Sequence, residues 1–589
     1  MLTRHRLPAA DLDALASGLG SAATIAGLRP AQLSMRLIAL RAVLDAAERA
    51  GHENHLPGFD LLSKVQERHP GPVAEVLGYP FIGSWAARCL RLLGGGDGVP
   101  GSIQADLGHL RGIAAAAAIR AGVSFSIEVP VRDGATYLPT LGRLMRAEGL
   151  PAVTIRGDGR DIRAGRVSLT DSPDWQPLRR ISSVTDGQVL AVVLDDVDPF
   201  RGGPRLPVAP RLGAGAVRTW EHSVGQAWGI LVRHHPDYAG AIGAGLVTLV
   251  PMVAAQPNRG VNATSRESFG AASISPVRDP VTLAVGILHE FQHCKLNAVL
   301  DLVKLHRPDE ERHYAPWRQD PRPLGGLLHG TYAYIGVSDF WRVQATLATT
   351  SFPAYAQMEF ARWSDRTARV LDGLLGSQSL TPVGQRFILG MRERLRSWPE
   401  TVPEEPGRLA RTAAADHRLG WRLRNAHPDA TAVDALASAW RAGAAAPAGV
   451  TATHLVDGGI ALGASSRLDL LYLRLREPGR LAAMTHSTGI ERADAELISG
   501  NVTQAAAGYL ERIRQEPRCP DGWAGLAMAL GESTPALLHA PELVCAVYNR
   551  LLETAAGTPD PGVLAEWMAP AVPADPFQLS DPVSPSPSR

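Results

Sequence analysis

The chain has 589 residues, of which 45% are hydrophobic, so it is long enough to bury several hydrophobic cores. Its 59 basic and 58 acidic residues nearly cancel, which excludes a global field that would attract nucleic acid or an anionic membrane. The four cysteines show no CxxC spacing, which argues against a disulfide framework, a zinc ribbon or an iron–sulfur cluster. The N-terminus has no signal-peptide pattern, and the apolar runs at 113–119 and 241–255 are shorter than a membrane span, so we expect a cytoplasmic protein.

The first part of the chain, residues 1–122, is expected to be a helical region, because leucines within 31–50 recur at steps of three and four. Residues 123–345 are expected to form the catalytic core. This core begins with a β-rich segment, in which 123–129 alternates and 189–194 has the pattern of a buried strand. Further strands are expected within 246–250 and 269–274, followed by a helix that Pro280 can open.

The remainder is expected to be helical over 346–465 and again over 466–569. In the second of these regions, a turn at Gly500-Asn501 and a proline at 517 resemble one tetratricopeptide-like helical pair. A single pair cannot bury its own face, so we expect it to pack on its neighbour. Residues 570–589 contain few apolar residues and are expected to be disordered. The expected fold class is α+β, predominantly helical.

The motif His289-Glu290-Phe291-Gln292-His293 carries the clearest chemical signal. In the helix expected over 282–305, histidines four positions apart lie on one face about one turn apart, close enough for both imidazoles to reach one metal ion. Apolar residues before the motif indicate that this helix enters a core, where polar side chains need partners. We therefore expect His289 and His293 to bind a divalent metal, and a satisfied buried histidine pair is the alternative.

A catalytic metal site also needs a third protein ligand and open positions for water or substrate. We expect His329 as that ligand because it lies in an apolar segment. The other candidates lie in a charged connection and are Asp301, Asp309, Glu310 and His313. The metzincin spacing is absent, since positions 296 and 299 are leucine and valine.

Three arginines downstream of the motif are candidates for holding a carboxylate through paired hydrogen bonds. Arg318 and Arg322 lie in the proline-rich stretch 314–326, and Arg342 follows Phe340-Trp341. The alternative is that Arg318 pairs with Asp320 as part of the loop structure.

Taken together, these motifs resemble the HEXXH-motif domain of actinobacterial peptide-maturation clusters, which occurs alone or fused behind a radical SAM enzyme of the FxSxx type. The resemblance covers most of the chain and rests on Ala31-Gln32-Leu33-Ser34, Ser268-Phe269-Gly270-Ala271, the HExxH motif, Pro316-Trp317-Arg318, Asp320-Pro321-Arg322-Pro323, His329-Gly330 and Phe340-Trp341. No CxxxCxxC motif is present, so the radical SAM half is missing.

The resemblance implies iron(II)- and 2-oxoglutarate-dependent β-hydroxylation, with O2 as oxidant, of residues in a ribosomally made precursor peptide. His289, His293 and His329 would then hold iron, Glu290 would orient a ligand or a water, and Arg318, Arg322 or Arg342 would bind the distal carboxylate of 2-oxoglutarate. An all-histidine set departs from the usual two histidines and one carboxylate, but imidazole suits iron as well as zinc.

Two other functions stay open at this point. The first is a zinc metallopeptidase in which Glu290 is the general base that activates metal-bound water. The second is a non-catalytic peptide-binding protein with a structural metal. The sequence does not specify the peptide, the modified residue or the oligomeric state.

Overall fold

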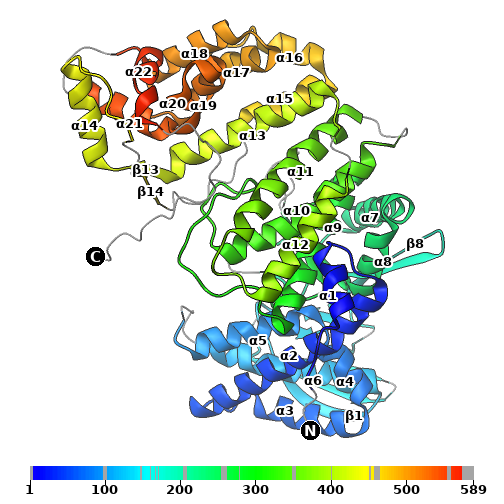
Figure 1. The fold of residues 1–589 in the computed structure, drawn as a ribbon. Helices are drawn as coiled ribbons and strands as arrows, with labels where there is room; N and C mark the ends of the chain where they lie inside the picture. Colours follow the sequence, from blue (N-terminus) through cyan, green and yellow to red (C-terminus); the bar gives the residue numbers. More distant parts are fainter. Residues whose placement is uncertain are drawn as a thin grey trace. The chain divides into compact units, whose positions relative to one another are not determined.

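The computed structural model describes residues 4–96, 102–145, 149–159, 161–165, 167–169, 171–202, 208–253, 262–277, 279–347, 353–398, 401–449, 453–456, 465–553 and 559–572. In this part of the chain, twenty-two α-helices are combined with several small sheets, which all lie in the N-terminal half except for one two-stranded ribbon (Figure 1). The predicted α+β, predominantly helical fold class is therefore confirmed. The chain divides into two compact units, Met1–Val303 and Lys304–Arg589. The finer division into five segments stays a prediction.

The first unit opens with six helices, and the leucines whose spacing predicted a helix lie in the second of them. They are α1 (Ala9–Ala16), α2 (Ala22–Arg49), α3 (Leu56–Arg68), α4 (Pro70–Leu77), α5 (Pro80–Leu93) and α6 (Ser102–Ala121). The alanine-rich run is the centre of α6, where Ile113 and the five alanines that follow it are fully buried. Small side chains let neighbours approach closely: a Cβ on Gly112 would lie 2.4 Å from the carbonyl oxygen of Tyr137. Among the described helices, none combines the length and apolar character that crossing a membrane requires.

Three sheets follow in the same unit. The first has the order β1-β4-β5-β6 and the second the order β2-β3-β7. Their strands are β1 (Ser124–Pro130), β2 (Ala135–Leu138), β3 (Gly142–Met145), β4 (Ala152–Asp158), β5 (Ile162–Ala164), β6 (Val167–Ser168) and β7 (Trp175–Pro177). The core of α2 to α6 continues into both sheets through Val129, Leu138 and Ile155.

The third sheet positions the metal motif and has the order β11-β12-β10-β9-β8. Its strands are β8 (Arg179–Thr185), β9 (Gln188–Leu194), β10 (Thr248–Pro251), β11 (Asn262–Ala263) and β12 (Ala271–Ile274). Strands β9, β10 and β12 are parallel, which requires crossover connections. The first crossover contains α7 (Ala214–His234) and α8 (Pro236–Gly245). After β12 the chain enters α9 (Pro280–Leu302), which packs against α2, α7 and β12.

The second unit consists almost entirely of helices. They are α10 (Leu324–Gln344), α11 (Pro353–Leu375), α12 (Pro382–Arg396), α13 (Glu404–Asn425), α14 (Ala430–Arg441), α15 (Ser466–Arg476), α16 (Pro478–Met484), α17 (Gly489–Ser499), α18 (Val502–Gln515), α19 (Pro520–Leu530), α20 (Pro535–His539), α21 (Pro541–Leu552) and α22 (Pro561–Trp567). A two-stranded ribbon joins β13 (Ala426–Pro428) to β14 (Thr453–Leu455).

The helical pair predicted near the C-terminus is formed by α17 and α18. Gly500 has a left-handed backbone (φ 96°) at the end of α17, which a glycine adopts without steric penalty. Helix α19 then packs on α18, where Gly525 leaves room for the ring of Tyr509. The predicted tail begins inside the 3₁₀ turn Ala569–Ala571, and residues 573–589 lie outside the described part.

Candidate metal centre

The helix that carries the HExxH motif begins at a well-formed cap. The side chain of Asp279 accepts a hydrogen bond from the backbone N–H of Thr282 at 2.8 Å, and Pro280 occupies the first helical position. The helix ends at Leu302, three residues before the predicted end, because Val303 is extended (φ −136°, ψ 127°). Leu305 lies beyond the helix, and its carbonyl oxygen accepts the backbone N–H of Thr381.

His289 and His293 project from the same face of α9, and their Nε2 atoms are 3.2 Å apart. A metal ion at the usual ~2.05 Å from both nitrogens would make an N–metal–N angle of about 100°, between the octahedral and tetrahedral values. The side chain of His289 is 22% exposed, so a ligand could reach it. This geometry fits two histidine ligands of one divalent metal.

Glu290 lies beside His289 in the motif and is buried, with a side chain that is 2% exposed. Its Oε2 accepts a hydrogen bond from Oγ1 of Thr264 at 2.6 Å, and the same hydroxyl is 3.2 Å from the main-chain oxygen of Glu290. The Oε1 atom lies 3.8 Å from Nε2 of His289. Thr264 directly follows the edge strand β11, so the sheet fixes the orientation of the glutamate.

Burial changes the protonation of the motif. It lowers the pKa of His289 to about 4, so the imidazole is neutral at physiological pH, which is the form that binds a metal. Burial also raises the pKa of Glu290 to about 8, and the hydrogen bond from Thr264 acts in the opposite direction. Deeper in the same helix, burial lowers the pKa of Lys295 to about 7, and its ammonium donates to the carbonyl oxygens of Gly18 and Leu19.

Within the described ranges, no three histidine, cysteine, aspartate or glutamate side chains are grouped so that they could hold a metal ion. The structure thus brings together two of the predicted ligands. His329 belongs to α10 in the second unit, where its side chain is half-buried. Its role as third ligand stays a prediction.

The proline-rich stretch before His329 packs on α10. Its ends are joined by two backbone hydrogen bonds between His313 and Arg322. The indole of Trp317 stacks on Tyr334, with ring centroids 4.8 Å apart, and lies over Gly330. A Cβ at position 330 would be 2.0 Å from Nε1 of Trp317, so only glycine fits there. This packing gives a physical reason for the Trp317 and His329-Gly330 motifs.

The two arginines of this stretch share one carboxylate. Nε of Arg318 donates to Oδ1 of Asp320 at 2.8 Å, and Nη1 of Arg322 donates to Oδ2 at 3.0 Å. Both arginines lower the pKa of Asp320, against the opposing effect of its burial. The alternative foreseen from the sequence, that Arg318 pairs with Asp320 within the loop, is therefore what the structure contains.

Arg342 is likewise engaged by a carboxylate. It lies 2.7 Å from Asp339, which also accepts a hydrogen bond from Arg394 at 2.9 Å, and its guanidinium lies over the ring of Trp398. Binding of 2-oxoglutarate by any of the three candidate arginines is not tested by these contacts and stays a prediction.

One residue near the motif was not found from the sequence. Thr264 lies 26 positions before Glu290, and no local pattern marks it as a partner of that glutamate. It could have been found only by placing β11 beside α9, because the hydroxyl of Thr264 follows β11 and donates its hydrogen bond to a side chain of α9.

Comparisons with known proteins do not add an assignment. No protein-family model matches the chain, and neither does any curated protein.

Proposed function

We propose that this chain is an iron(II)- and 2-oxoglutarate-dependent oxygenase that β-hydroxylates residues of a ribosomally made precursor peptide. The observation that carries the metal site is the 3.2 Å separation of the His289 and His293 Nε2 atoms on the open face of α9. The choice of an oxygenase rests in addition on the resemblance of the motif set to peptide-maturation HEXXH domains.

The candidate site residues would have the following roles in this oxygenase. His289 and His293 hold the metal and His329 supplies the third ligand, while iron, when bound, supplies the activation of dioxygen. Glu290, fixed by Thr264, orients a ligand of the metal rather than meeting the substrate. Arg318, Arg322 or Arg342 binds the distal carboxylate of 2-oxoglutarate, and must for this purpose share or release its aspartate partner.

A zinc metallopeptidase is the second candidate, and one distance favours it. Oε1 of Glu290 lies 3.8 Å from Nε2 of His289, so a small change of rotamer would bring the carboxylate beside a metal-bound water. In that enzyme Glu290 would remove a proton from the water.

The deciding experiment is anaerobic reconstitution of the full chain with iron(II), followed by exposure to oxygen with 2-oxoglutarate and the precursor peptide encoded beside it. We expect succinate in step with a peptide that is heavier by one oxygen atom. The products should disappear in His289→Ala and His293→Ala and persist in His222→Ala, which removes an exposed histidine of α7. Peptide fragments formed with zinc, without succinate, would refute the oxygenase.

Glu290→Gln separates the two mechanisms further. A peptidase should lose nearly all turnover while it keeps its metal, because the general base is gone. An oxygenase should retain partial turnover, since the amide can still occupy the place of the carboxylate beside Thr264.

A further inference from the structure

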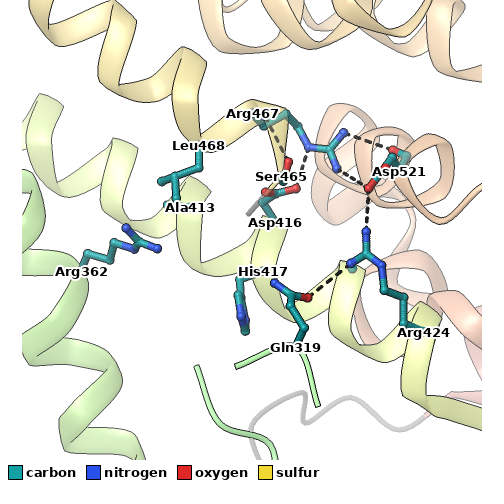
Figure 2. Close-up of a pocket in the computed structure, with 11 residues that line it drawn as sticks. Gln319, Arg362, Ala413, Asp416, His417, Arg424, Ser465, Arg467, Leu468 and Asp521 are labelled. Carbon is teal, nitrogen blue, oxygen red and sulfur yellow. Dashed lines mark hydrogen bonds and ion pairs between the residues drawn. The ribbon is translucent and has the colours of Figure 1, made fainter. Parts of the chain in front are cut away.

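The second unit contains a small pocket with a cavity volume of about 30 Å³, remote in sequence from the HExxH motif. Its wall is built by α11, α13 and the first turns of α15 and α19, together with the loop residue Gln319 (Figure 2). Three guanidinium groups from three different helices line it: Arg362, Arg424 and Arg467. Arginine presents a planar fork of donors that suits an oxyanion.

Arg362, one of the lining residues, has a donor without an acceptor in the part of the chain that the structure describes. It is buried, and Nη1 donates to Glu359 at 3.2 Å and to the hydroxyl of Tyr472 at 2.7 Å. Its Nε is buried and has no acceptor among the described residues. Figure 2 shows the guanidinium directed from α11 toward Ala413. A buried N–H without an acceptor is unfavourable, so an acceptor that reached it would be stabilising.

A second buried arginine lies behind the same wall. Arg366 donates to the main-chain oxygens of Pro316 and Ala413, at 3.2 and 2.6 Å, and its own Nε is another buried donor without an acceptor in the described chain. Because Ala413 lines the pocket, this guanidinium adds positive charge close to it.

The acidic side chains of the wall are engaged by arginines. Asp416 accepts from Nε of Arg467 at 2.6 Å, and Asp521 accepts from Arg424 at 3.0 Å. In addition, the first turns of α15 and α19 point the positive ends of two eleven-residue helices at the pocket. Glu359 and Asp494 pair with Arg362 and Arg467 as well, so carboxylates offset the arginines of the wall, and Arg366 and the two helix ends supply the remaining positive potential.

Burial and nearby positive charges both act on the neighbouring imidazole of His417. The pKa of His417 is held well below its usual value, first by burial and then by the positive charges of Arg366, Arg362 and Arg424. The same three positive charges would attract an added anion, whereas burial would oppose it.

Gly420 provides the space that Arg424 needs. It lies inside α13, near the C-terminal end, where glycine is about 1 kcal/mol less favourable than alanine. A Cβ at this position would lie 2.8 Å from Nη1 of Arg424 and would displace the guanidinium. The glycine thus preserves the position of an arginine in the pocket wall.

We infer that this pocket binds a small oxyanion, a carboxylate or a phosphate group, through Arg362 and Arg424. The inference is independent of the metal site, since every residue it uses belongs to the second unit.

The test is isothermal titration of the metal-free full chain with glutarate and with inorganic phosphate at low ionic strength. We expect at least one of the two to bind, and the one that binds identifies the group. Arg424→Gln should weaken that binding about tenfold or more, because a charged hydrogen bond is lost. Gly420→Ala keeps every charge but moves Arg424, and it should weaken binding in the same direction.

Arg408→Gln is the matched control. Arg408 lies on the same helix and is also paired with one carboxylate, Glu405 at 2.9 Å, but it is not in the pocket wall. Its replacement should leave the affinity unchanged. Failure of both probes to bind would overturn the inference, as would equal weakening by Arg408→Gln and Arg424→Gln, which would indicate a response to overall charge.

Discussion

Replacement of the buried Arg467 tests how the second unit is held together. Arg467 is 1% exposed and bonds Asp416 at 2.6 Å and Asp494 at 2.9 Å, and these two carboxylates are themselves buried. Arg467→Met removes the cation and leaves both carboxylates inside the protein. Breaking a buried ion pair in this way lowers the free energy of unfolding by about 3–5 kcal/mol.

The contacts of the two aspartates place the loss near the lower end of that range. Asp494 keeps hydrogen bonds from the hydroxyls of Ser466 and Tyr509, both at 2.7 Å, whereas Asp416 loses its guanidinium partner. We therefore expect Arg467→Met to lose about 3 kcal/mol, measured by urea unfolding followed by circular dichroism.

Arg480→Met is the control. Arg480 is 70% exposed, and its ion pair with Glu477 is long, at 3.7 Å. It should change the free energy of unfolding by less than about 0.5 kcal/mol. Adding Asp416→Asn and Asp494→Asn to Arg467→Met should restore part of the loss, since neutral amides are easier to bury. A loss in Arg467→Met no larger than in Arg480→Met would refute the reasoning.

Three further predictions concern other parts of the chain. Gly330→Ala should lower the free energy of unfolding by about 1–3 kcal/mol in thermal denaturation, because the new methyl group overlaps Trp317. Thr264→Val should weaken metal binding about tenfold in calorimetric titration, because Glu290 loses its anchor. Asp198→Asn should reduce the loss of stability between about pH 4 and pH 8. Burial raises the pKa of Asp198 to about 8, so the folded chain keeps a proton that the unfolded chain has released above pH ~4, and wild-type stability falls as pH rises toward 8.

Each of these has a matched control. Gly240→Ala, in a helix position with nothing within 4 Å of the new Cβ, should not destabilise. Thr219→Val removes a hydroxyl that bonds only its own helix and should leave metal affinity unchanged. Asp60→Asn replaces an exposed carboxylate and should keep the wild-type pH dependence. A result in which a variant and its control behave alike would contradict the corresponding prediction.

The sequence predicted best what depends on local pattern. The period of the apolar residues located α2 and α9, Pro280 marked the start of the motif helix, and Gly500 marked the turn between α17 and α18. These features follow from the steric and hydrogen-bonding properties of a few adjacent residues. The 3.2 Å approach of His289 and His293 follows in the same way from their spacing on a helix.

What the sequence could not predict depends on residues that meet only in the folded chain. The partner of Glu290 lies on another element, and the pocket lined by Arg362, Arg424 and Arg467 draws on helices spread over more than a hundred positions. The end of α9 was placed three residues too late because the apolar pattern continues to Leu305, although the backbone already becomes extended at Val303.

The buried alanines of α6 have a consequence for mutation of the gene. Single-nucleotide changes in an alanine codon give valine, threonine, serine, proline, aspartate, glutamate or glycine, and most of these are larger or charged. At Ala114 to Ala118, which are fully buried, a larger side chain has no room and a charged one would have no water. This helix is therefore a segment in which most point mutations should be purged, and a deep mutational scan should show it as the least tolerant stretch of the first unit.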